Sequence, residues 1–145
     1  MWILNNDKPR QHTLLYIEDN RANLELVEQI VMLRDDLKLL TAPDAESAIT
    51  LAQKHLPNVN LMDINLPGIS GYDALKMLRR NPVTTRIPVM ALSANAIPSD
   101  IIIGMKSGFF GYTTKPFNID ELMIALSVAL TYAVETSQTN QDITL

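Results

Sequence analysis

Asp63 is the residue of this 145-residue chain whose type and position point most directly to chemistry. It ends an apolar run, and the chain then turns through Leu66, Pro67 and Gly68. A carboxylate at the end of a buried strand costs free energy unless it is paired or used. We therefore interpret Asp63 as a phosphate acceptor. An ordinary turn aspartate at the end of a strand is the simpler alternative.

Four further polar side chains follow apolar runs, where the carboxyl ends of strands would lie. Glu18 and Asp19 follow 13–17, Ser93 follows 87–92, and Lys115 lies just beyond 109–113. In a parallel sheet these ends share one edge, so we expect the side chains to meet Asp63 there. Three carboxylates at close range repel by roughly 3 kcal/mol per pair at an effective dielectric constant of about 20, so the cluster needs a counter-charge.

The expected counter-charges are a divalent cation and the ammonium of Lys115. Because the ligands are hard oxygens, with no imidazole or thiolate among them, we expect Mg²⁺, for which Mn²⁺ can substitute. Mg²⁺ with carboxylates and a lysine is the equipment of phosphoryl transfer, in which Asp63 would be the nucleophile. The Ser93 hydroxyl can donate a hydrogen bond to a transferred phosphoryl oxygen.

Five strands alternate with five helices along the chain, and these elements must position the polar residues. The expected strands are 13–17, 37–41, 58–63, 87–92 and 109–113. The expected helices lie around 24–31, 44–55 and 70–80, in a short segment from 98, and at 119–134. This alternation predicts a single-domain α/β fold with a parallel sheet covered on both faces. We expect the domain at 13–135, after an arm at 1–12 and before a polar, frayed tail at 136–145.

The composition argues against several classes of function. The net charge is −4, and Arg79-Arg80 is the only basic pair, which argues against direct binding of nucleic acid. The chain has no cysteine, which excludes thiolate metal sites, disulfides and cysteine nucleophiles and fits the cytoplasmic location that we expect. No apolar run is long enough for a membrane span, and the amino-terminal residues lack the features of a signal peptide, so we expect no association with a membrane.

Four segments together resemble the receiver domain of two-component response regulators, over about 14–130. They are Ile17-Glu18-Asp19-Asn20, Met62-Asp63-Ile64-Asn65-Leu66-Pro67-Gly68, Leu92-Ser93-Ala94 and Thr114-Lys115-Pro116-Phe117. The resemblance implies a (βα)5 flavodoxin-like fold, doubly wound, with strand order 2-1-3-4-5. It also implies that Asp63 takes a phosphoryl group from a phosphohistidine on a histidine kinase or a histidine phosphotransfer protein.

The resemblance also implies a set of ligands for Mg²⁺. Asp19, Asp63 and the backbone carbonyl of Asn65 would bind the ion directly, and Glu18 would act mainly through water. A receiver domain of this kind is a signalling phospho-acceptor rather than an enzyme, with self-phosphorylation and slow self-dephosphorylation only. If it belongs to a hybrid histidine kinase, the parent chain is a kinase.

The resemblance also implies a phosphorylation switch, formed by Ser93 and Tyr112. By the resemblance, Ser93 and Lys115 hold the phosphoryl oxygens, and the peptide bond between Lys115 and Pro116 is cis. On phosphorylation Ser93 would move toward the phosphoryl group, and Tyr112 would turn inward behind it. The alternative is that Tyr112 only packs on the helix that begins at Pro98.

The helix that begins at Pro98 carries three consecutive isoleucines, Ile101, Ile102 and Ile103. They cannot all face inward from one stripe of a helix. Either this helix is more buried than usual, or an isoleucine lies on a partner surface, and we favour an interface on the face formed by this helix, the 109–113 strand and the 119–134 helix. Ile102 and Ile103 would there contact a second copy of the chain, a kinase or an output partner.

Two other functions remain open on the sequence. A Mg²⁺-dependent phosphohydrolase of small molecules would also form an aspartyl phosphate, but its usual motif carries a general-acid aspartate where Asn65 stands. A receiver-like scaffold without phosphorylation is disfavoured because every acidic, hydroxyl and lysine position is filled.

We expect no helix-turn-helix after the last helix, so the chain is either a free-standing regulator or the receiver of a hybrid histidine kinase.

Overall fold

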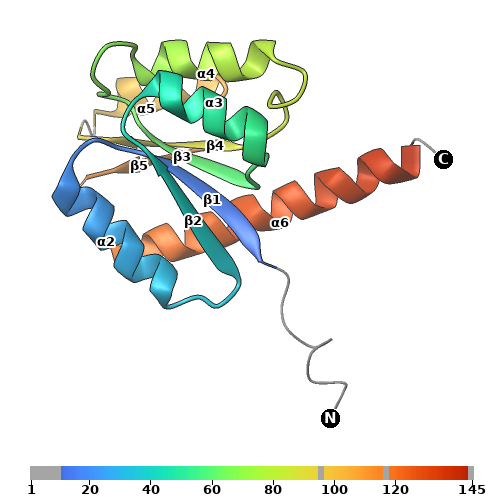
Figure 1. Ribbon diagram of the computed structural model, residues 1–145. Helices are drawn as coiled ribbons and strands as arrows, with labels where there is room; N and C mark the ends of the chain where they lie inside the picture. The colour runs from blue at the N-terminus through green and yellow to red at the C-terminus, as the bar shows by residue number, and fades with distance from the viewer. Residues whose placement is uncertain (1–10, 95–96, 116–117, 144–145) are drawn as a thin grey trace.

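The computed structural model describes residues 11–94, 97–115 and 118–143, which form one sheet and five helices (Figure 1). The strands are β1 (His12–Ile17), β2 (Leu37–Ala42), β3 (Val59–Asp63), β4 (Val89–Ser93) and β5 (Gly111–Thr114). The helices are α2 (Arg21–Met32), α3 (Ala45–His55), α4 (Gly71–Arg80), α5 (Pro98–Lys106) and α6 (Ile119–Ile143). The predicted alternation of strands and helices is confirmed.

The five strands are parallel and lie in the order β2-β1-β3-β4-β5, as the resemblance implied. Helices α3, α4 and α5 lie on one face of the sheet, and α2 and α6 lie on the other (Figure 1). Each face has its own apolar core, and the adjacent β3 residues Leu61 and Met62 pack into opposite ones. β3 is buried on both faces, and its residues are apolar apart from Asn60 and the terminal Asp63.

Side-chain caps fix where the helices begin. The side-chain oxygens of Asn20, Asp44 and Ser70 accept hydrogen bonds from the backbone N–H groups three residues further on. The Asn118 side chain accepts from the N–H groups of Asp120 and Glu121 at the start of α6. The caps at Asp44, Ser70 and Asn118 were predicted from the sequence. They define the loops that leave the carboxyl ends of the strands.

The last helix is longer than predicted. The sequence suggested an end near Val134, but α6 continues to Ile143. Residues 135–143 contain no glycine or proline, and extending an existing helix adds a hydrogen bond for each residue fixed without a new nucleation cost.

In the part of the chain described here, no helix is both long enough and apolar enough to cross a membrane. Positions 1–10 of the predicted arm at 1–12 lie outside the described residues.

Candidate functional site

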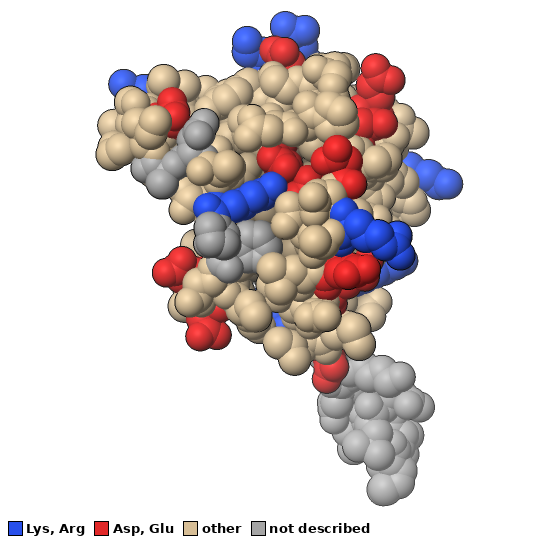
Figure 2. All heavy atoms as spheres, turned by 90° about the vertical axis from the view of Figure 1, so that its left-hand side faces the viewer, with Lys and Arg blue, Asp and Glu red and all other residues tan. Residues whose placement is uncertain are grey.

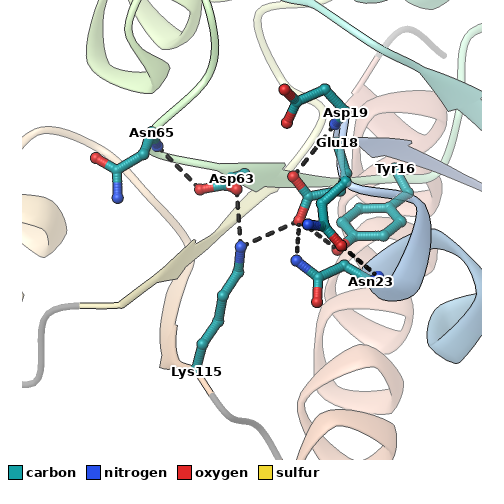
Figure 3. Close-up of polar contacts among 8 residues, drawn as sticks. Tyr16, Glu18, Asp19, Asn23, Asp63, Asn65 and Lys115 are labelled. Carbon is teal, nitrogen blue, oxygen red and sulfur yellow. Dashed lines mark hydrogen bonds and ion pairs between the residues drawn. The ribbon is translucent and has the colours of Figure 1, made fainter.

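Three of the predicted site residues meet at the carboxyl edge of the sheet. The Lys115 Nζ lies 3.0 Å from the Glu18 Oε1 and 2.8 Å from the Asp63 Oδ2 (Figure 3). Glu18 follows β1, Asp63 ends β3, and Lys115 follows β5. The Lys115 backbone N–H donates to the Ser93 carbonyl at 2.7 Å, which ties the end of β5 to the end of β4. The ammonium therefore bridges two carboxylates from different strands.

Asp63 is 6% exposed, and both of its carboxylate oxygens are held. The Asn65 backbone N–H donates to the Oδ1 at 2.9 Å, and Lys115 binds the Oδ2. Burial acts to raise the pKa of Asp63, but hydrogen bonds from Glu18, Lys115 and the Asn65 amide outweigh it and lower that pKa below its ordinary value. Asp63 is therefore the carboxylate of the pair that stays ionised.

Glu18 is 1% exposed and accepts four hydrogen bonds. Its Oε1 accepts from the Asn23 Nδ2 at 2.7 Å, the Lys115 Nζ at 3.0 Å and the Tyr16 hydroxyl at 3.2 Å. Its Oε2 accepts from the Asp19 backbone N–H at 3.2 Å. Burial, followed by its contact with Asp63, raises the pKa of Glu18. Its position is thus fixed, and it is the carboxyl of the pair that protonates first.

Sequence reasoning missed Tyr16 and Asn23. Tyr16 is fully buried, and its hydroxyl lies two residues before Glu18 on the same side of β1, as the two-residue period of a strand requires. A phenol hydroxyl near the carboxyl end of a largely apolar strand was the available signal. Asn23 lies in the first turn of α2 and offered no comparable signal. A polar residue at the start of a helix is usually solvent-facing, and the sequence does not show that its amide points toward Glu18.

Asp19 and Asn65 are exposed, unlike Glu18 and Asp63. The Asp19 carboxylate points away from the Lys115 ammonium, and the Asn65 side chain points away from Asp63 (Figure 3). Within 11–94, 97–115 and 118–143, no group of three or more histidine, cysteine, aspartate or glutamate side chains is arranged to hold a metal ion. Of the three predicted carboxylates, Glu18 and Asp63 contact the Lys115 ammonium, and the Asp19 side chain is exposed.

Ser93 and Tyr112 lie on the neighbouring strands β4 and β5. Ser93 is buried at the end of β4, in register with Thr114. Tyr112 is half-buried, and its ring packs on α5, where a Cβ added to Gly104 would lie 2.6 Å from the Tyr112 Cδ2. Pro116, and with it the predicted cis bond, lies outside the described residues.

The edge that carries these residues is a concentrated patch of charge. Figure 2 shows acidic side chains gathered near the middle of this face, next to a basic one. Burial acts to lower the pKa of Lys115, but Asp63 and Glu18 outweigh it and raise that pKa, so the ammonium stays charged. An ionised carboxylate that is held in place can act as a nucleophile. A cation beside it can stabilise the negative charge that develops on the group under attack.

Residues 14–127 match the family model of the response regulator receiver domain. The chain is 32% identical to the phosphate regulon transcriptional regulatory protein PhoB of Klebsiella pneumoniae over 117 residues, 81% of this chain and 51% of that protein. It is 32% identical to the response regulator PleD of Caulobacter vibrioides over 111 residues, 77% of this chain and 24% of that protein. The chain thus spans about half, or less, of these curated relatives.

Solved structures show the same likeness. The receiver domain of the sensor histidine kinase PA1611 from Pseudomonas aeruginosa, with a magnesium ion coordinated in its active site cleft, is 28% identical and superposes with a TM-score of 0.76. The match covers 83% of this chain and 98% of that one. The Francisella response regulator 1452 receiver domain is 28% identical with a TM-score of 0.77, covering 84% and 98% of the two chains.

Proposed function

The chain belongs to the response regulator receiver domain family, and from this membership we propose that Asp63 is its phosphorylation site. The observation that carries the proposal is the contact of Lys115 with both Asp63 and Glu18 at the carboxyl edge of the sheet. Receiver domains of response regulators are signalling proteins, and the phosphoryl donor proposed here is a phosphohistidine on a histidine kinase or a histidine phosphotransfer protein.

The proposed step is a transfer of one phosphoryl group between two side chains. An Asp63 carboxylate oxygen forms a bond to phosphorus, and the bond from phosphorus to the donor imidazole nitrogen breaks. The imidazole leaves with the electron pair of that bond. Lys115 already lies 2.8 Å from the Asp63 Oδ2, so its ammonium can neutralise charge on the transferred oxygens, and the Ser93 hydroxyl can donate to one of them.

The donor chemistry of the site fits Mg²⁺. Glu18, Asp19 and Asp63 offer hard carboxylate oxygens, the Asn65 carbonyl offers another, and two buried carboxylates share a single ammonium. Asp19 would have to turn its exposed side chain toward Asp63 to join the ligand set. When bound, the ion neutralises phosphoryl charge and orients the donor phosphate. Mn²⁺, which also prefers oxygen ligands, would take the same donors.

The face of α5, β5 and α6 is the proposed output surface. The Tyr112 ring packs on Gly104, so an inward turn of Tyr112 would change how α5 lies on the sheet. Ile102 and Ile103 are 53% and 54% exposed on α5, which leaves them available to a second copy of the chain or another protein. If the partner is a second copy of the chain, a homodimer should form on phosphorylation. Light scattering with a phosphoryl mimic tests for this dimer.

Acetyl phosphate provides the test of the phosphorylation site. With Mg²⁺ present, intact-protein mass spectrometry should show an addition of about 80 Da, the mass of one phosphoryl group. Asp63→Asn should abolish it. Asp73→Asn, which changes an exposed carboxylate in the first turn of α4, should leave it unchanged. An addition that survives in Asp63→Asn at the same rate would refute the assignment.

A further inference from the structure

A pocket of about 660 Å³ lies away from Asp63, where the segment between α4 and β4 and the residue before β5 meet α6. Among the residues that line it are the arginines Arg79 and Arg86, the aromatic residues Phe110 and Tyr132, and the threonines Thr85 and Thr136. The volume falls within the range of small-molecule sites, roughly 300–1,000 Å³. In the described part of the chain, no aspartate or glutamate lines this pocket.

Arg79 is half-buried, and among the described residues its guanidinium donates only to backbone carbonyl oxygens. Its Nη1 donates to the carbonyls of Thr85 at 2.9 Å and Ile87 at 2.7 Å, and its Nη2 donates to the Gly108 carbonyl at 3.3 Å. These bonds fix the guanidinium at the pocket wall without neutralising it. Burial lowers the pKa of Arg79, as expected for a cation without a carboxylate partner. The guanidinium has five N–H donors, so some remain for a ligand.

Arg86 adds a second uncompensated charge. It is exposed and forms no ion pair in the described ranges, where the ion pairs involve Arg21, Arg34 and Lys115. The chain as a whole carries a net charge of −4, so a pocket with two guanidinium groups and no lining carboxylate runs against the overall balance. Guanidinium groups bind phosphate and carboxylate with paired hydrogen bonds.

Aromatic rings form another part of the pocket wall. The rings of Phe110 and Tyr132 lie with centroids 5.0 Å apart and an interplanar angle of 41°. Tyr132 is 45% exposed on α6, so part of its ring is open to a ligand. A flat ring system can stack on such a surface while its charged group reaches the arginines.

We propose that this pocket binds a phosphate monoester attached to an aromatic ring system, the chemistry of a nucleoside monophosphate. Two guanidinium groups match the charge of about −1.5 to −2 on a phosphate monoester better than that of a single carboxylate. The hydroxyls of Thr85 and Thr136 can serve the sugar or the phosphate. The pocket is separate from Asp63, so its occupancy does not require phosphoryl transfer.

Titration of the full chain with AMP and GMP, followed by calorimetry and by amide chemical shifts, tests this proposal. At least one nucleotide should bind saturably, with a dissociation constant below about 1 mM. Adenosine or guanosine alone, and inorganic phosphate alone, should bind at least about tenfold more weakly, since each retains only one half of the recognition. Equal binding by phosphate alone would overturn the aromatic part of the proposal, and no saturation by either nucleotide would overturn the whole.

Arg86→Gln is the decisive variant, because Arg86 is exposed and forms no ion pair among the described residues, so the change should leave the fold intact. It should weaken nucleotide binding by about tenfold or more. Arg80→Gln removes an exposed arginine next to Arg79 that does not line the pocket, and it should bind as the unmodified protein does. Equal binding by both variants would overturn the proposal. Phosphorylation of Asp63 by acetyl phosphate should be unchanged in Arg86→Gln, so failure at one site is distinguishable from failure at the other.

Discussion

At the scale of single residues, Glu18 shows how a buried carboxylate is kept in place at a cost. Tyr16, Asn23 and Lys115 all donate to one of its oxygens, yet burial still raises its pKa. A group whose pKa is higher in the folded state contributes its full stability below its unfolded pKa, near 4.5, and loses it as the pH rises through the folded value. Ionised Glu18 therefore destabilises the metal-free protein at neutral pH.

Glu18→Gln should stabilise the metal-free protein by about 1 kcal/mol at pH 7, since its amide oxygen can still accept from Tyr16, Asn23 and Lys115 without a charge, although the bond from the Asp19 N–H is lost. Chemical denaturation between about pH 4 and pH 8 should show a difference in the free energy of unfolding that grows with pH. The exposed Glu28, changed to Gln, is the control and should alter stability by less than about 0.5 kcal/mol. A difference that instead grows as the pH falls would contradict the pKa shift.

Asn60 is a second residue whose environment departs from its chemistry. It is fully buried in β3, and neither side-chain atom has a hydrogen-bond partner among the described residues. Asn60→Leu should therefore raise the free energy of unfolding by about 1–3 kcal/mol, the cost of an unsatisfied buried polar group. Asn58→Leu is the contrast, because the Asn58 Oδ1 accepts from the Thr13 N–H at 2.7 Å, and its loss should destabilise. Urea denaturation of both variants would show opposite signs.

At the scale of elements, the approach of α4 to the end of β3 positions Asp63. Gly71 begins α4, and a Cβ there would lie 2.8 Å from the Ile64 Cα and 3.2 Å from the Asp63 carbonyl oxygen. These are backbone atoms, so the helix itself would have to shift. The close packing of helix and strand thus depends on the absence of a side chain at Gly71.

Gly71→Ala should lower the free energy of unfolding by about 1–3 kcal/mol through overpacking and slow the phosphorylation of Asp63 by acetyl phosphate. Gly111→Ala in β5 is the matched control, because its Cβ would make an ordinary contact of 3.9 Å with the Met90 Cγ. Denaturation midpoints and phosphorylation rates of the two variants check this. Equal midpoints would show that α4 can move without cost.

At the scale of the whole molecule, the carboxyl edge gathers charge from three strands, and ligand binding there should stabilise the entire fold. By mass action, Mg²⁺ at about 100 times its dissociation constant should add about 2.7 kcal/mol to the free energy of unfolding. Asp19→Asn should reduce this gain if the Asp19 side chain turns in to bind the ion. The exposed Asp35, changed to Asn, should retain it. Thermal unfolding with and without Mg²⁺ measures the gain, and identical gains in both variants would remove Asp19 from the proposed ligands.

Much of the fold was predictable because its signals are local. Apolar runs that end in polar residues indicated the strands, and capping residues such as Asp44 and Ser70 indicated where helices begin. The end of α6 was not predictable in the same way. Nothing in residues 135–143 forbids a helix or requires one, so its extent depends on continuation from the preceding turns.

By itself, the sequence determined that Glu18, Asp63 and Lys115 reach one edge, because parallel strands deliver their carboxyl ends to the same side of a sheet. The tertiary structure alone decided how these side chains are arranged there. The Lys115 ammonium contacts both carboxylates, the Tyr16 hydroxyl donates to Glu18, and Asp19 is exposed. A side-chain rotamer depends on neighbours from elements distant in sequence, and these neighbours exist only once the sheet and its covering helices have assembled.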